Sequence, residues 1–214
     1  MGNNVMTIDE LTELLRLYLS SCQTDDEKIQ ALNHIRCCLH RFSPLRDEPV
    51  DCVMWVRTDE ILANDYNPNV MAPAEKRLLA LSLEEDGFTQ PVVVAAEKGR
   101  YRIVDGYHRY LLGRKVAGSE KKRQGYLPVT VIRPGREGKA LRIAATIRHN
   151  RARGKHQVEP LSEIIRDLAR QGWCADKIGT ELGMDADEVL RLMQIGGLIE
   201  LFADDIFSAA WTVR

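Results

Sequence analysis

Apolar side chains recur at helical spacing in the first fifty residues. The two series are Ile8, Leu11, Leu15 and Tyr18, followed by Ile29, Leu32, Ile35 and Leu39. A capping box precedes each series, Thr7 with Glu10 and Thr24 with Glu27, which marks two helix starts. Ser43-Pro44 ends the second helix, because the residue before a proline disfavours helical backbone. The pattern predicts a helical hairpin, which we interpret as an accessory or oligomerisation element.

From Cys52 the periodicity changes, and short β-type runs alternate with helical ones. Strands are predicted at residues 52–56, 91–95, 101–104 and 127–132, and helices at 73–86, from 107 onward and at about 138–150. Lys98-Gly99 joins two of these strands as a hairpin. In the helix that Pro73 opens and Gly87 caps, we expect Leu78, Leu81 and Leu79 to be buried. Such alternation is typical of an α+β domain.

The last sixty residues read as helical throughout. Helices are predicted from Pro160, over 173–182 and over 185–195, separated by Gly172 and Gly183. Residues 173–192 match a helix-turn-helix, with apolar Ile178, Leu182, Val189 and Leu192, small Gly179 for close packing, and Gly183 in the turn. We therefore expect three units: a helical hairpin at 1–48, a mixed domain at 49–137 and a helical domain at 138–214.

Composition restricts the class of protein further. The chain has 214 residues, 44% hydrophobic and 29% charged, which suits a soluble globular protein and excludes disorder along its whole length. No apolar run or basic leader indicates a membrane span or signal peptide, so a cytoplasmic location without membrane association is expected. The five cysteines are Cys22, Cys37, Cys38, Cys52 and Cys174. Their scattered spacing predicts reduced thiols and no metal site.

The net charge of −1 conceals a strong asymmetry along the chain. Residues 95–155 carry 17 basic and 4 acidic side chains, a net +13, whereas the segments 1–50, 51–94 and 156–214 carry −3, −5 and −6. A basic block of this kind attracts polyanions such as nucleotide phosphates or nucleic acid. A solvated basic face is the alternative interpretation of the charge alone.

The segment from Ile103 to Tyr110 carries the strongest chemical signal, a strand that ends at Asp105-Gly106 and turns directly into a helix. Glycine permits close backbone approach to a ligand, and free N–H groups at a helix start favour an anion. Arg109 offers a bidentate phosphate donor, and His108 offers a second donor or a titratable group. The alternative is a tight turn in which Asp105 caps the helix and Arg109 pairs with a carboxylate.

The order of motifs resembles the ParB/sulfiredoxin superfamily over about residues 52–196. An Asn67-Pro68 segment and a helix precede Gly87-Phe88-Thr89-Gln90-Pro91-Val92, and the turn Gly106-Tyr107-His108-Arg109 follows the hairpin. His149-Asn150-Arg151-Ala152-Arg153 stands where ParB proteins have a Glu-Asn-x-x-Arg box, and a helix-turn-helix comes next. The implied fold is a small mixed sheet with helices, between the hairpin and the helical domain. The overall plan is most similar to the IbrB/YbdM type of ParB-like regulator.

The resemblance implies a CTP pocket. The nucleotide-binding residues carried over are Gln90, Asp105, Gly106, Tyr107, His108, Arg109, Asn150 and Arg153. His149 replaces the glutamate that helps to place magnesium in the family, and an imidazole cannot supply a hard carboxylate oxygen. Binding of CTP without turnover is therefore compatible with the sequence, and the need for Mg²⁺ stays open.

Two enzymatic relatives provide alternatives. Sulfiredoxins act through a cysteine in the equivalent turn, and residues 105–109 contain none. Free-serine kinases of this superfamily use a similar turn with ADP or ATP, which Asp105 and His108 match as catalytic candidates. Their base is a glutamate near the asparagine-proline segment, and Glu75 is the nearest one here, although it falls inside a predicted helix. Nuclease activity is disfavoured because no side-chain cluster suited to two metal ions is apparent.

DNA is the second expected partner, with a partner protein and a homodimer as further options. The recognition helix offers only Arg191 and Gln194 as base readers, after an acidic start at Asp185-Ala186-Asp187-Glu188. The basic residues Arg148, Arg151 and Lys155 are therefore stronger candidates for DNA contact. We expect a regulatory protein that binds a nucleotide, CTP first and ATP or ADP as alternatives, and that associates with DNA or a partner protein.

Overall fold

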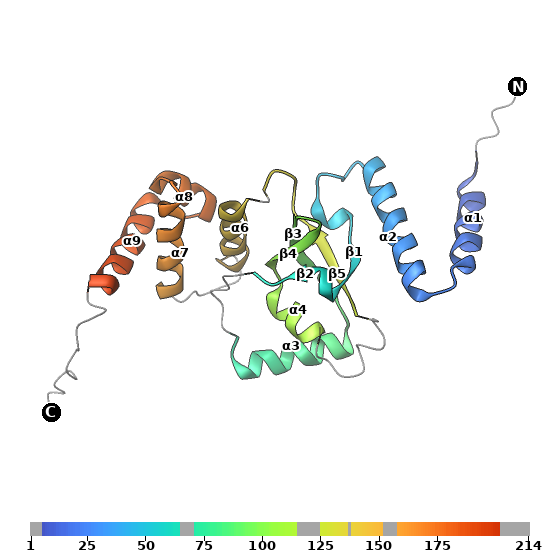
Figure 1. The fold of residues 1–214 in the computed structure, drawn as a ribbon, viewed down its shortest axis with the longest axis horizontal. Helices are drawn as coiled ribbons and strands as arrows, with labels where there is room; N and C mark the ends of the chain where they lie inside the picture. Colours follow the sequence, from blue (N-terminus) through green and yellow to red (C-terminus); the bar gives the residue numbers. More distant parts are fainter. Residues whose placement is uncertain (1–5, 65–70, 115–124, 137, 152–157, 202–214) are drawn as a thin grey trace, which may run out of the picture.

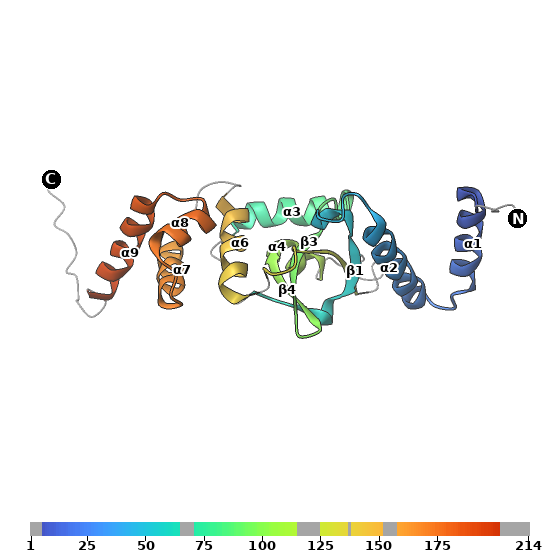
Figure 2. The ribbon, with the colours of Figure 1, turned by 90° about the horizontal axis from the view of Figure 1, so that it is seen from above.

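Three groups of elements follow one another along an elongated molecule (Figures 1 and 2). The structure, a computed structural model, describes residues 6–64, 71–114, 125–136, 138–151 and 158–201. Helices α1 and α2 lie at one end, the sheet with α3 and α4 in the middle, and α6 to α9 at the other end. The expected α+β class is confirmed.

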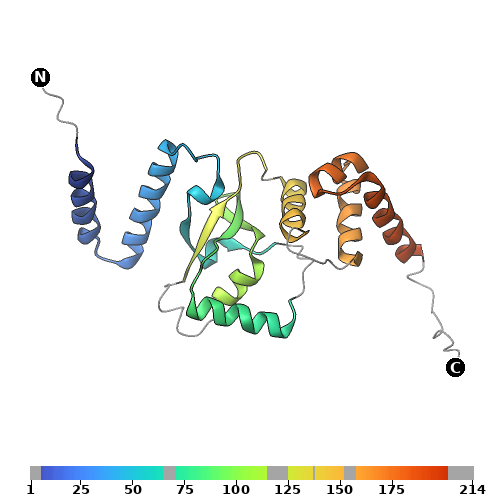
Figure 3. The same ribbon diagram turned by 180° about the vertical axis from the view of Figure 1, so that it is seen from behind.

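The N-terminal hairpin consists of α1 (Ile8–Ser21) and α2 (Asp25–Phe42). Both predicted capping boxes are present, with the hydroxyl of Thr7 or Thr24 accepting from the backbone three residues on. α1 stands away from the sheet (Figure 3) and contains no buried residue. Its apolar side chains are largely exposed, Ile8 at 73% and Tyr18 at 57%. The oligomerisation role of this hairpin stays a prediction.

A five-stranded mixed sheet occupies the centre, in the order β1-β5-β3-β4-β2. The strands are β1 (Met54–Arg57), β2 (Ile61–Leu62), β3 (Val92–Glu97), β4 (Arg100–Asp105) and β5 (Tyr126–Val131), with two 3-10 turns at Pro49–Asp51 and Thr58–Glu60. β3 pairs antiparallel with β4 and parallel with β5. Lys98 and Gly99 turn the predicted hairpin, both with positive φ, as a tight two-residue loop requires. The short strand β2 was not predicted.

Helices α3 (Pro73–Glu85) and α4 (Tyr107–Gly113) cover one face of the sheet, with α3 packed on α4 (Figure 2). The central core on this face includes Val92, Val94, Ile103, Tyr110 and Leu127. The predicted buried face of α3 is wrong at Leu78 and Leu81, which are 68% and 54% exposed, whereas Leu79 is half-buried. Leu83 is the buried residue of this helix. α3 packs mainly on α4, and most of its side chains stay exposed.

The C-terminal helices are α6 (Lys139–Arg151), α7 (Val158–Arg170), α8 (Ala175–Leu182) and α9 (Ala186–Leu201). α7 begins two residues before Pro160, which is tolerated in a first turn, and α9 continues six residues past the predicted end at Ile195. Their shared core contains Ile143, Ile147, Leu161, Ile165, Leu168, Ile178, Leu182, Val189 and Leu192. The core residues predicted for the helix-turn-helix are confirmed.

Helix α6 forms a wall common to the sheet and to the helix-turn-helix. Ile143 and Ile147 belong to the C-terminal core, whereas Ala145 packs against Val104 of β4. The buried hydroxyl of Thr146 donates to the Val104 carbonyl oxygen at 2.8 Å. Because this short helix buries side chains on both sides, a displacement of α6 would disturb its packing against the sheet and against the helix-turn-helix.

Candidate functional site

The turn between β4 and α4 is built around Gly106. Its φ of 88° and ψ of 22° lie in the left-handed region, which glycine adopts without steric cost. The ladder is irregular between Val93 and Val94, where β3 faces the end of β4. Such irregularities redirect a side chain locally. A Cβ at position 106 would lie 2.9 Å from Nη2 of Arg109, so the guanidinium occupies the space that glycine leaves open.

Arg109 is held in place by three neighbours. Nη1 donates to Oε1 of Gln90 at 2.8 Å, and Nη2 lies 3.3 Å from the Pro91 carbonyl oxygen and 3.5 Å from Oδ2 of Asp105. The Asp105 side chain is only 5% exposed and that of Arg109 14%. The carboxylate pairing of the tight-turn interpretation is therefore present, whereas Gly106 caps the helix without a side-chain hydrogen bond. The Arg109 guanidinium is therefore held in a fixed position beside the backbone of Gly106.

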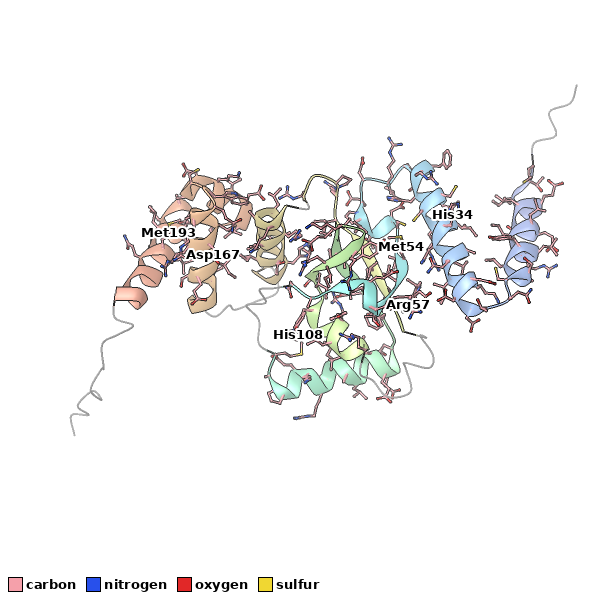
Figure 4. The ribbon with its side chains drawn as sticks, in the orientation of Figure 1. His34, Met54, Arg57, His108, Asp167 and Met193 are labelled. Carbon is pink, nitrogen blue, oxygen red and sulfur yellow. The ribbon has the colours of Figure 1, made fainter. Side chains whose placement is uncertain are left out.

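His108 lies on α4 near the start of α3 (Figure 4). Burial is the main cause that lowers the pKa of this imidazole, the Glu75 carboxylate opposes the shift, and the Lys76 ammonium adds to it. The Tyr107 ring meets the imidazole edge at a centroid distance of 5.8 Å. A neutral His108 at pH 7 can donate from one ring nitrogen and accept at the other.

Glu75 is engaged at the start of α3, where its Oε2 accepts from the Ala72 backbone N–H at 3.1 Å. Glu75 is also the glutamate nearest to the asparagine-proline segment, and therefore the candidate base of a kinase. The structure brings it within electrostatic range of His108 and also gives it a capping role.

The asparagine-arginine box begins in the last turn of α6, where Asn150 and Arg151 continue the helix. Their side chains, and the whole of Arg153 and Lys155, lie outside the described residues. The path of α6 can be followed up to this point: Arg142 pairs with Glu97 at the far end of the β3-β4 hairpin, and Thr146 contacts Val104. One further helical turn therefore leads α6 toward the end of β4, the side on which Gly106 lies.

Several arginines of the basic block form ion pairs within the fold. Glu97 pairs with both Arg102 and Arg142, and Arg133 pairs with Glu48 of the acidic N-terminal segment. The hydrogen bond from Arg102 is the main cause that lowers the pKa of Glu97, with Arg142 contributing. Glu97 belongs to the basic segment and is already counted in its net charge of +13, whereas Glu48 lies outside that segment. The pairing of Arg133 with Glu48 therefore offsets part of the +13 charge, and a charge count along the sequence does not reveal it.

Arg148, a predicted DNA contact, is paired with a carboxylate of the helix-turn-helix, and its contact with DNA stays a prediction. Its Nη1 lies 2.7 Å from Oε2 of Glu181 in α8, and Nη2 of Arg136 lies 2.6 Å from the same oxygen. Burial by itself raises the pKa of Glu181, but the two arginines hold it below its ordinary value. Glu181 was not predicted from the sequence, because its partners Arg136 and Arg148 lie more than thirty residues away and no local pattern indicates such ion pairs.

The helix-turn-helix geometry follows its glycines. A Cβ on Gly179 would lie 2.7 Å from the Met184 carbonyl oxygen, so α8 and the turn approach too closely for any other residue. The acidic residue Asp185 caps the start of α9, since its Oδ1 accepts from the Glu188 backbone N–H at 2.6 Å. Arg191 and Gln194 are both exposed, three residues apart on one face of α9. The two predicted base readers are thus accessible together, with exposed Asp187 one turn before Arg191.

Two kinds of feature are absent from the residues that the structure describes. No group of three or more histidine, cysteine, aspartate and glutamate side chains in this part of the chain is placed to hold a metal ion. Within the same residues, no helix has the length and apolar character needed to cross a membrane.

Comparison with known families gives two adjoining matches. Residues 46–144 match the ParB N-terminal domain, and residues 156–204 match the IbrB-like C-terminal HTH domain. Over the full length of both proteins, the chain is 54% identical to the uncharacterized protein YbdM of Escherichia coli strain K12. The chain therefore belongs to the ParB-like proteins that join a ParB N-terminal domain to an IbrB-like helix-turn-helix domain.

A shorter match connects the chain with the probable chromosome-partitioning protein ParB of Helicobacter pylori. The two are 36% identical over 63 residues, which span 29% of this chain and 22% of that protein. This similarity concerns a segment and not the whole of either protein.

Three solved ParB structures align with this chain with TM-scores below 0.5. The C-terminally truncated ParB of Caulobacter crescentus bound to the centromeric parS site aligns with TM-score 0.43 and 18% identity, over 66% of this chain and 70% of that one. The same protein with CTP-gamma-S gives 0.39 and 16%, over 70% and 83%. A Pnob8-like ParB-N domain gives 0.43 and 13%, over 72% and 62%.

Proposed function

We propose that the protein is a nucleotide-responsive regulator of the ParB-like family. In this proposal a nucleotide, CTP in the first instance, binds with its phosphates at Gly106 and Arg109, and binding changes the association of the helix-turn-helix with DNA or a partner protein. The observation that carries the proposal is the Arg109 guanidinium, preorganised over a left-handed glycine at the end of a strand.

The Arg109 side chain is already ordered before a ligand binds. Gln90, the Pro91 carbonyl oxygen and Asp105 fix the guanidinium in one position, which reduces the entropy lost on binding. Arginine suits phosphate because its planar fork can donate two parallel hydrogen bonds. A helix of only seven residues has a small dipole, so we assign the attraction to this side chain and the adjoining backbone N–H groups.

Helix α6 would transmit nucleotide binding to the helix-turn-helix. This helix contacts β4 through Thr146, and its Arg148 is clamped to Glu181 of α8. A triphosphate that drew the end of α6 toward the pocket would act on both contacts together. Reorientation of the helix-turn-helix is then the proposed response to the nucleotide.

Thermal unfolding with CTP, ATP, ADP and GTP, each with and without Mg²⁺, tests the pocket. At about 100 times its Kd a ligand adds about 2.7 kcal/mol, which corresponds to a rise in Tm of roughly 5–10 °C for a chain of this size. We expect a shift selective for CTP that is lost in Arg109→Ala and retained in Arg16→Ala, an exposed arginine on α1. Equal shifts in the two variants, or no shift with any nucleotide, would contradict the proposal.

A small-molecule kinase remains the second candidate, because His108 and Glu75 share one electrostatic environment. This function requires transfer of phosphate from ATP or ADP to a hydroxyl such as that of free serine. A Tm shift selective for ADP or ATP, accompanied by phosphoserine in the product mixture, would favour it over the regulator. Absence of transfer across a panel of hydroxyl substrates would exclude it.

We propose that the exposed face of α9 contacts DNA. Replacing Arg191 with alanine is expected to weaken DNA binding by about 1–3 kcal/mol, since the arginine is one of two accessible readers. Asp187→Asn is expected to strengthen binding, because it removes repulsion of phosphates one turn away. Fluorescence anisotropy on a duplex of mixed sequence, at several salt concentrations and with or without CTP, measures both changes.

Arg170→Ala provides the matched control. Arg170 is an exposed arginine of the same helical unit, on α7, and pairs with Asp167 three residues before it. Equal losses in Arg191→Ala and Arg170→Ala would mean that binding reports general charge and not the α9 face. Salt-insensitive binding would also contradict a phosphate-directed interaction.

A further inference from the structure

Three sulfur atoms from two chain segments meet where α2 packs beside β1. Sγ of Cys37 lies 3.9 Å from Sγ of Cys52 and 3.4 Å from Sδ of Met54. Cys52 has extended backbone, with φ −126° and ψ 99°, and Met54 begins β1 two residues later. Side chains two residues apart in an extended segment project to the same face. Figure 4 shows Met54 at the sheet edge beside α2.

Polar contacts on both sides fix this meeting point. Asn33 donates to the Trp55 carbonyl oxygen at 2.6 Å and accepts from the Trp55 backbone N–H at 2.9 Å. His40 Nδ1 lies 2.6 Å from Oδ2 of Asp51. Since Asn33, Cys37 and His40 follow one face of α2, the helix is held against residues 51–55 before and after the sulfur atoms. The sulfur cluster is therefore part of an ordered junction.

The cluster is accessible to a small ion. Cys37, Cys52 and Met54 all line a cavity of about 920 Å³ between α2, the 3-10 turn at Pro49–Asp51 and the end of β5. An ion entering this cavity would meet three sulfur donors without having to displace a helix.

We propose that Cys37, Cys52 and Met54 form a binding site for a soft monovalent cation, Cu(I). Thiolate and thioether sulfurs favour Cu(I) over harder ions such as Mg²⁺ or Ca²⁺. Three sulfurs about 2.3 Å from one ion in a trigonal plane stand about 4 Å apart. The Sγ atoms of Cys37 and Cys52 are 3.9 Å apart, and Sδ of Met54, 3.4 Å from Cys37, would have to move outward by about half an ångström. On binding, the two thiols release their protons to solvent and the thioether donates as a neutral ligand.

The ligand set also explains why sequence analysis predicted no metal site. Cys37 is fifteen residues from Cys52 and the third donor is a methionine, so no cysteine or histidine spacing motif arises. Methionine also separates this site from a simple dithiol, because a thioether cannot join a disulfide. The site is independent of the proposed nucleotide pocket, which lies on another part of the sheet.

Anaerobic Cu(I) titration against a competing chromogenic chelator, bicinchoninate, tests the site. The starting protein carries Cys22→Ser, Cys38→Ser and Cys174→Ser, so that Cys37 and Cys52 are the only thiols in the chain. We expect one Cu(I) per chain, with X-ray absorption showing sulfur neighbours at about 2.3 Å. Cys37→Ser and Cys52→Ser should abolish binding.

Met54→Leu separates a metal site from ordinary packing of sulfur atoms. Leucine conserves the volume of methionine, so the fold is expected to survive while Cu(I) affinity falls about tenfold or more. Met193→Leu, a methionine on α9, is the matched control and should retain full affinity. Unchanged affinity in Met54→Leu or Cys52→Ser, or preferential retention of Zn²⁺ over Cu(I), would overturn the assignment.

Discussion

Replacing Ile165 with alanine is expected to lower the free energy of unfolding of the C-terminal helices by about 2–5 kcal/mol. Ile165 is fully buried, in the middle of the core that α6, α7, α8 and α9 share. Truncation removes three methyl or methylene groups from a site that surrounding helices cannot collapse to fill, so the lost burial and the cavity both count. Urea unfolding monitored by far-UV circular dichroism measures the loss.

Leu190→Ala is the matched control for this substitution. Leu190 is 47% exposed on α9, so its truncation should change stability by no more than about 0.5 kcal/mol. Hydrogen exchange adds a spatial test: in Ile165→Ala the amides of α8 and α9 should exchange faster, while those of the central strand β3 keep their protection. Equal destabilisation by the two substitutions would mean that this cluster does not act as a core.

The local features of the fold were predictable from sequence because they involve neighbours along the chain. Thr7 with Glu10, the Lys98-Gly99 loop and Gly179 each depend on backbone geometry within a few residues, and each is confirmed. The same reasoning placed Gly106 and Arg109 in one turn, and in the structure the Arg109 guanidinium occupies the space that a side chain at position 106 would need.

Features that depend on distant partners were not predictable in this way. The helical spacing of Leu78 predicted a buried side chain, but this residue is exposed because its face of α3 does not pack on α4. The pairing of Arg148 with Glu181 and the approach of Cys37 to Cys52 arise from docking between separate elements. Charge counts have the same limit, since an arginine assigned to a polyanion can be neutralised by a carboxylate from elsewhere in the chain.

Gly106→Ala is expected to abolish the nucleotide-dependent rise in Tm, whereas Gly99→Ala should leave it intact. Both glycines have positive φ, 88° and 78°, so alanine imposes a similar backbone cost of about 1–2 kcal/mol at either position. The surroundings differ: a Cβ at Gly106 would meet three atoms of the Arg109 guanidinium, whereas nothing lies within 4 Å of one at Gly99.

The added methyl group would push the Arg109 guanidinium away from Gln90, the Pro91 carbonyl oxygen and Asp105. Because the buried Asp105 carboxylate then loses this partner, we expect Gly106→Ala to have a lower Tm than Gly99→Ala without nucleotide, and to show no further rise when CTP is added. A full CTP shift in Gly106→Ala would show that the observed position of Arg109 is not needed for binding. Loss of the shift in both variants would point to backbone strain instead, because only Gly106 lies against the guanidinium.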